Sequence, residues 1–140
     1  MSKHVDIDIT VPNQTKYLAM IGKIGESLAH TLGGYQGDRE ELAYHLNLVL
    51  TEALANAIFH ANAGDPQKEV RLSITAGDNK LVIKVFDQGQ GFDIHQLANV
   101  KVKGLAEGGR GIQIIFKVMD QVRYLKNGPG HVLEMTKNLR

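Results

Sequence analysis

The stretch that decides the fold is residues 42–60, which read LAYHLNLVLTEALANAIFH. Apolar residues occur nearly all round a helix of this sequence, which is typical of a helix buried in a protein interior. Asp38 followed by Glu41 resembles a capping box, so we predict that the helix begins there, continues through Phe59 and is largely buried.

Three polar residues interrupt this apolar helix at four-residue steps: Glu52, Asn56 and His60. Side chains spaced in this way form one stripe along a helix. An unpaired carboxylate in a core is strongly unfavourable, whereas a cavity that holds a metal ion, water or phosphate removes that penalty. The alternative is that the stripe reaches the surface and Glu52 only hydrogen-bonds Asn56, with His60 as an ordinary structural histidine.

The patterns on either side of this helix predict the remaining elements. Alternating residues upstream indicate a strand, and the residues that follow indicate a helix whose inward face carries Tyr17, Met20, Ile21, Ile24 and Leu28, with Gly33-Gly34 at its end. Downstream, the patterns indicate two hairpins separated by a third helix. The predicted elements are strand 5–11, helix 14–32, the strand pair 70–74 and 81–85, the helix from Gly108–Gly111 to about Met119, and the strand pair 122–125 and 132–135.

This order predicts a two-layer α/β sandwich, with a mixed, mainly antiparallel sheet covered on one face by helices. The 140 residues are interpreted as a single domain, 1–140. A net charge of +1 gives no broad electrostatic footprint for nucleic acid, and the absence of cysteine excludes thiolate catalysis and cysteine-ligated zinc. We see no apolar signal core at the N-terminus and no stretch near the roughly 18 residues of a membrane helix, so a cytoplasmic location fits best.

Two glycine-bearing turns are candidate ligand-binding segments. Asp87-Gln88-Gly89-Gln90-Gly91 follows directly after a strand, where we expect an exposed carboxylate that suits an adenine amino group and glycines that allow close backbone approach. Gly108-Gly109-Arg110-Gly111 precedes a helix, whose free N–H groups could receive phosphate oxygens with Arg110 or a loop lysine adding charge. The alternatives are an ordinary strand-ending turn and a flexible helix entry, and neither segment has P-loop or Rossmann spacing.

Taken in order, the segments 52–60, 87–92 and 109–112 resemble the three nucleotide-binding boxes of the GHKL ATPase superfamily. Nearly the whole chain is similar to stand-alone anti-sigma-factor serine kinases of the RsbW type. The resemblance implies ATP and Mg²⁺ as cofactors, with Glu52 as general base, Asn56 as the Mg²⁺ ligand and Asp87 as the adenine reader. It also implies a lid over the phosphates at residues 93–107. The remaining nucleotide-binding residues that it implies are Gly89, Gly91, Lys101, Lys103, Gly109, Arg110, Gly111 and Ile112.

The function implied by this resemblance is ATP-dependent phosphorylation of a serine on a small, STAS-type anti-sigma-factor antagonist, together with sequestration of a sigma factor. It implies neither direct nucleic-acid binding nor a membrane, and it implies a homodimer. Two departures are visible: His131 follows Gly130 where the family has a threonine, and no arginine occurs in the lid before Gly108. The alternatives are therefore an ATP-gated protein-binding module without kinase activity and a nucleotide-independent interaction domain.

Overall fold

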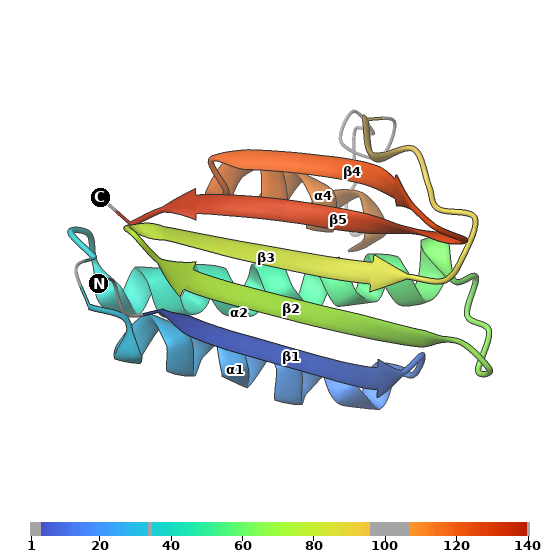
Figure 1. Cartoon of the computed structure of the whole chain (residues 1–140), viewed down its shortest axis with the longest axis horizontal. Helices are drawn as coiled ribbons and strands as arrows, with labels where there is room; N and C mark the ends of the chain where they lie inside the picture. Colours follow the sequence, from blue (N-terminus) through green and yellow to red (C-terminus); the bar gives the residue numbers. More distant parts are fainter. Residues whose placement is uncertain (1–3, 34, 96–106, 140) are drawn as a thin grey trace.

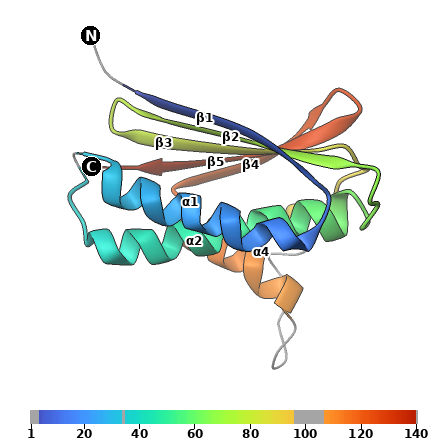
Figure 2. The same ribbon diagram turned by 90° about the horizontal axis from the view of Figure 1, so that it is seen from below.

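The computed structural model describes residues 4–33, 35–95 and 107–139, which form one antiparallel sheet and a layer of helices. In Figures 1 and 2 the helices all lie on one face of the sheet, and the other face is uncovered. The sheet has the order β1-β2-β3-β5-β4. Its strands are β1 (Val5–Pro12), β2 (Glu69–Gly77), β3 (Lys80–Asp87), β4 (Gln121–Asn127) and β5 (Gly130–Asn138).

The predicted two-layer sandwich is confirmed, and its sheet is more regular than expected. All four strand pairings in the described part are antiparallel, so the parallel pairing of a mixed sheet is not found there. Alternation of side chains gives the sheet one apolar and one polar face. Across the strands, the apolar face carries the row Ile7, Ile74, Ile83, Met135 and Val122.

The outer face of the sheet is held by exposed ion pairs. Glu134 on β5 lies 2.6 Å from the Arg123 guanidinium and 3.7 Å from the Lys84 ammonium. Arg71 pairs with Asp8 at 2.7 Å, and this guanidinium holds the pKa of the Asp8 carboxyl below its usual value. Such a face is the solvated side of a half-buried sheet.

Helix α1 (Leu18–Thr31) follows a short 3-10 turn, η1 (Thr15–Tyr17). Its predicted inward face is correct except at Met20, which is 48% exposed. The helix ends at Thr31, directly before the predicted glycine end, and the Arg39 guanidinium donates to the carbonyls of Ala29 and Leu32 at 2.6 and 2.5 Å. Gly34 lies outside the described residues.

Helix α2 (Arg39–Asn56) begins as predicted, with the Asp38 side chain accepting from the backbone N–H groups of Glu40 and Glu41. It continues as a π-helical turn, η2 (Ala57–Ala61). Together these form a segment long and apolar enough to cross a membrane by length and composition alone, so the interpretation that no stretch of the sequence comes near this length is corrected. More than half of its most apolar part is buried inside the protein. Core helices of soluble proteins often have the same length and composition.

Candidate functional site

The Glu52 carboxylate on α2 lies directly against Gly111 of α4 (Glu107–Val118). A Cβ at position 111 would overlap a carboxylate oxygen of Glu52 and would come within 3.0 Å of its Cδ. Glu52 is partly exposed, and Gly111 is buried. The fold therefore brings together two of the segments that the sequence singled out, and glycine at position 111 makes the close approach possible.

Asn56 lies one helical turn beyond Glu52 and is only 3% exposed. Its side-chain Nδ2 has no hydrogen-bond partner among the residues that the structure describes. Leaving a buried donor unsatisfied costs about 1–3 kcal/mol, so an orphaned group of this kind needs an explanation. A bound polar ligand would supply the missing partner.

The predicted stripe of Glu52, Asn56 and His60 is interrupted after Asn56. The next turn is π-helical, and the Asn62 N–H donates to Ala57 O five residues back, at 2.8 Å. Four-residue steps therefore no longer keep side chains on one face. His60 is exposed, with its ring centroid 6.0 Å from that of Phe92. The alternative that the stripe reaches the surface is correct for His60, which is exposed, but wrong for Asn56, which is buried.

Asp87 ends β3 and is 6% exposed, so the prediction of an exposed carboxylate is wrong. Its Oδ1 accepts a hydrogen bond from Gly89 N at 3.0 Å, and its Oδ2 accepts one from the Tyr124 hydroxyl at 2.7 Å. Burial is tolerated because charge-assisted hydrogen bonds replace water around the carboxylate.

Tyr124 on β4 lies against Asp87 and was not among the predicted site residues. Burial, followed by the hydrogen bond to Asp87 and the charge of that carboxylate, raises the pKa of Tyr124 well above its ordinary value. The hydroxyl therefore stays protonated and acts as a donor to Asp87. Its ring packs on Phe92 at 4.5 Å and stacks on His131 at 5.1 Å, with 9° between the latter two planes.

His131 is the second residue of β5 and pairs with Asp87 across the sheet. Its Nδ1 lies 3.6 Å from Asp87 Oδ1 and, like the Asn56 amide, is buried without a hydrogen-bond partner in the described part of the chain. The ring also occupies the space beside Gly91, whose φ is +81° and where a Cβ would come 2.7 Å from His131 Cε1. Glycine is required there by both the positive φ and the contact.

The remaining predicted site residues are placed unevenly. Ile112 is fully buried in α4 and Gly89 is buried in the turn after β3. Lys101 and Lys103 lie outside the described residues, as does most of the expected lid, and so does the side chain of Arg110. The predicted helix opened by Gly108–Gly111 is confirmed: α4 begins one residue earlier, at Glu107, so Gly109 and Arg110 belong to its first turn.

That position still suits phosphate binding, because the first four N–H groups of a helix have no partner within the helix. Mg²⁺ takes oxygen ligands and usually keeps several waters and substrate phosphates. The described residues contain no group of three or more histidine, aspartate or glutamate side chains suited to a metal ion. A site built on the Asn56 amide oxygen and ligand phosphates fits this donor set.

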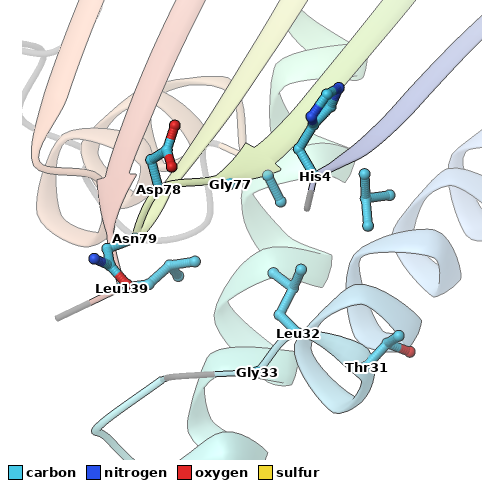
Figure 3. A pocket seen from close by; sticks show the side chains of 10 residues that line it. His4, Thr31, Leu32, Gly33, Gly77, Asp78, Asn79 and Leu139 are labelled. Atoms are coloured by element: carbon cyan, nitrogen blue, oxygen red, sulfur yellow. The ribbon is translucent and has the colours of Figure 1, made fainter. Parts of the chain in front are cut away.

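A separate cavity of about 350 Å³ lies at the other end of the sheet (Figure 3). It is lined by residues of the β2–β3 turn, including Asp78 and Asn79, and by Thr31, Leu32 and Leu139. Strand β3 begins at this end of the sheet and reaches Asp87 at the opposite end. The cavity is therefore distant from Asp87, and none of the predicted site residues lines it.

The arrangement of the sheet and its helices, with Glu52 and Asn56 on α2 and Asp87 at the end of β3, agrees with a kinase-like ATPase domain. The chain belongs to the histidine kinase-like ATPase domain family, whose profile matches residues 18–137.

The curated relatives include the serine-protein kinase RsbW of Bacillus subtilis strain 168, 30% identical over 141 residues, which cover 95% of this chain and 85% of the relative. RsbW of Bacillus licheniformis is 31% identical over 145 residues, with the same coverage of both chains. The resemblance to the RsbW type is therefore confirmed.

A solved structure with the same fold is the histidine kinase domain of the Erythrobacter litoralis EL346 blue-light activated histidine kinase. The TM-score is 0.56 at 20% identity, over 92% of this chain. The chain spans 62% of that structure's length, and at this identity the likeness concerns the fold alone.

Proposed function

We propose that this chain binds Mg-ATP and transfers the γ-phosphoryl group to a serine of a small anti-sigma-factor antagonist. In this proposal, residues 1–140 act as one ATPase domain in the cytoplasm, and the unphosphorylated antagonist and a sigma factor compete for the chain. The proposal is supported by the family membership and by the similarity to RsbW proteins, which are named serine-protein kinases.

The observation that carries the proposal is the convergence of Glu52, Asn56 and Gly111. The Glu52 carboxylate lies against Gly111 of α4, and one helical turn further along α2 the buried Asn56 amide has a donor without a partner among the described residues. Phosphoryl transfer depends mainly on positioning and charge stabilisation, so a base, a metal ligand and a phosphate cradle form a sufficient set.

In the proposed reaction, Glu52 accepts the proton of the substrate serine hydroxyl. The serine oxygen forms a bond to the γ-phosphorus while the bond to the β,γ-bridging oxygen breaks, and ADP leaves. The Asn56 amide oxygen is the proposed protein ligand of Mg²⁺, which when bound neutralises charge on the phosphates. The first N–H groups of α4 are proposed to bind phosphate oxygens.

At the base end, Asp87 is proposed to accept a hydrogen bond from the adenine amino group, with Gly89 and Gly91 giving the floor of the pocket. The rings of Tyr124 and His131 lie beside this carboxylate, and Phe92 packs on Tyr124, so the proposed base-binding end is bordered by aromatic side chains. We also predict that Lys101, Lys103 and Arg110 contact the phosphates, and no described contact tests this. Homodimerisation also stays a prediction, and the edge strand β1 offers unpaired backbone groups for it.

The second candidate function is an ATP-gated protein-binding module that does not transfer phosphate. It is favoured by His131, whose ring fills the space beside Asp87 and Gly91 where the resemblance implies a threonine. Such a module would bind nucleotide and change its partner affinity without making phosphoserine.

The test is to incubate the protein with Mg-ATP and a purified candidate antagonist from the same organism and to look for phosphoserine by mass spectrometry. We expect one phosphoserine with the wild type and a loss of about 100-fold or more in rate with Glu52→Gln, since general bases contribute about 10²–10⁴. Nucleotide binding without phosphoserine on any partner that the protein binds would favour the gated module. A wild-type rate in Glu52→Gln would remove the assigned base.

A further inference from the structure

Asn62 is fully buried directly after the π-helical turn, and all three hydrogen-bonding groups of its side chain have partners. Its Nδ2 donates to Asn13 Oδ1 at 3.1 Å and to Glu69 O at 3.2 Å. Its Oδ1 accepts from Gln88 N at 2.8 Å. Such a fully satisfied polar group in a core fixes the relative position of the segments that it joins.

The segments joined here are distant in the chain. Asn13 follows β1, Glu69 begins β2, and Gln88 lies in the turn after β3. Asn13, itself 4% exposed, is anchored by donating to Asp65 O at 3.0 Å. The Gln88 side chain adds a second link to β2, because its Oε1 accepts a hydrogen bond from Glu69 N at 2.8 Å.

The turn after β3 also lies directly on the end of the central helix. A Cβ at Gly89 would overlap the carbonyl of Ala61, the residue that precedes Asn62. Gly89 N in turn donates to Asp87 Oδ1 at 3.0 Å. The contact between Gly89 and the end of the central helix therefore sets the position of Asp87 relative to Glu52 and Asn56 on that helix.

We propose that Asn62 is a positioning residue that holds the Asp87 turn in register with the Glu52–Asn56 helix. The proposal rests on the proposed nucleotide site, because it assigns Asn62 the task of fixing the distance between the base-binding and phosphate-binding ends of that site. The Asn62 side chain bonds neither the Asp87 carboxylate nor Glu52: it acts through its bond to the Gln88 N–H and through the packing of the helix end on Gly89.

The experiment compares Asn62→Ala and the milder Asn62→Ser with Asn13→Ala. Asn13→Ala is the matched control because it removes a buried amide from the same network but leaves the bond from Gln88 N to Asn62. Three quantities are measured: the free energy of unfolding, the dissociation constant for Mg-ATP in the folded protein, and the amide hydrogen exchange of Gln88. Binding is titrated under conditions in which each variant is folded, so that a loss of stability does not enter the dissociation constant.

We expect all three variants to lose stability, and only the Asn62 variants to lose protection at the Gln88 amide. In these the Mg-ATP dissociation constant should rise about tenfold, because one ligand contacts both ends of the proposed site and a lost contact of about 1.4 kcal/mol is a factor of ten. Loss of Gln88 protection with unchanged affinity, or an equal loss of affinity in Asn13→Ala, would overturn the positioning role. If the wild type does not bind Mg-ATP, the proposed nucleotide site fails, and the positioning role fails with it. In that case the amide hydrogen exchange of Gln88 still shows whether the hydrogen bond from Gln88 N to Asn62 Oδ1 exists.

Discussion

The hydroxyl of Tyr124 donates a hydrogen bond of 2.7 Å to Asp87 Oδ2, joining β4 to the end of β3 across the intervening strand β5. The carboxylate proposed to bind the base amino group is therefore already satisfied in the protein alone. A nucleotide that uses this oxygen must share it with the phenol or displace the phenol.

Tyr124→Phe should lower the stability of the protein without nucleotide by about 1–3 kcal/mol, the usual effect of losing a hydrogen bond to a charged group. Stabilisation by Mg-ATP should become larger than in the wild type, because an amino group of the base can then satisfy the freed oxygen. Urea unfolding with and without Mg-ATP measures both effects. Tyr44→Phe is the control, since Tyr44 is 64% exposed. An equal loss of stability with and without nucleotide would contradict the shared use of Asp87.

Stability should fall as the pH rises above about 10, the ordinary pKa of tyrosine in an unfolded chain. The folded-state pKa of Tyr124 is raised, so above that pH the unfolded state releases a proton that the folded state retains. The contribution is fully present below pH 10 and is lost as the pH rises towards the folded pKa. Because other tyrosines and lysines titrate too, the measurement is the difference in unfolding free energy between wild type and Tyr124→Phe at pH 9 and 11. A difference that does not shrink between those two pH values would refute it.

Asn56→Ala should cost little stability for a buried residue, because the amide donor that is removed has no partner in the described part of the chain. The same variant should lose the stabilisation by nucleotide, which for the wild type is about 2.7 kcal/mol at 100 times the dissociation constant. Thermal melts with and without Mg-ATP test this combination. A full nucleotide-induced shift in Asn56→Ala would remove Asn56 from the site.

Gly111→Ala should reduce phosphotransfer nearly as much as Glu52→Gln while leaving the fold intact. The added Cβ would overlap the Glu52 carboxylate and push the proposed base away, whereas alanine within a helix gains up to about 1 kcal/mol over glycine. Gly33→Ala is the matched control, because a Cβ there meets nothing within 4 Å. Initial rates of phosphoserine formation and melting temperatures are compared for both variants. A wild-type rate in Gly111→Ala would show that the position of Glu52 is not critical.

The sequence determined the elements and the polar residues on the central helix, because these depend on local periodicity and turn chemistry. The pattern of residues 42–60 predicted a buried helix with Glu52 and Asn56, and alternation predicted five strands that the structure contains. The helix boundaries were less evenly determined: α4 begins within one residue of the predicted Gly108, but the π-helical turn after Asn56 was not predicted.

Only the tertiary structure decided which distant side chains meet. The order β3-β5-β4 brings Tyr124 and His131 to Asp87, and no local pattern in β4 marks Tyr124 as different from any half-buried strand residue. Likewise, the sequence around Asn62 and Asn13 is typical of ordinary turns. Only the fold brings the ends of β1, the central helix and β3 together, so that these side chains form hydrogen bonds between them. The physical reason is that periodicity records which face of an element is buried, while hydrogen-bond partners far apart in the chain are set by strand order and register.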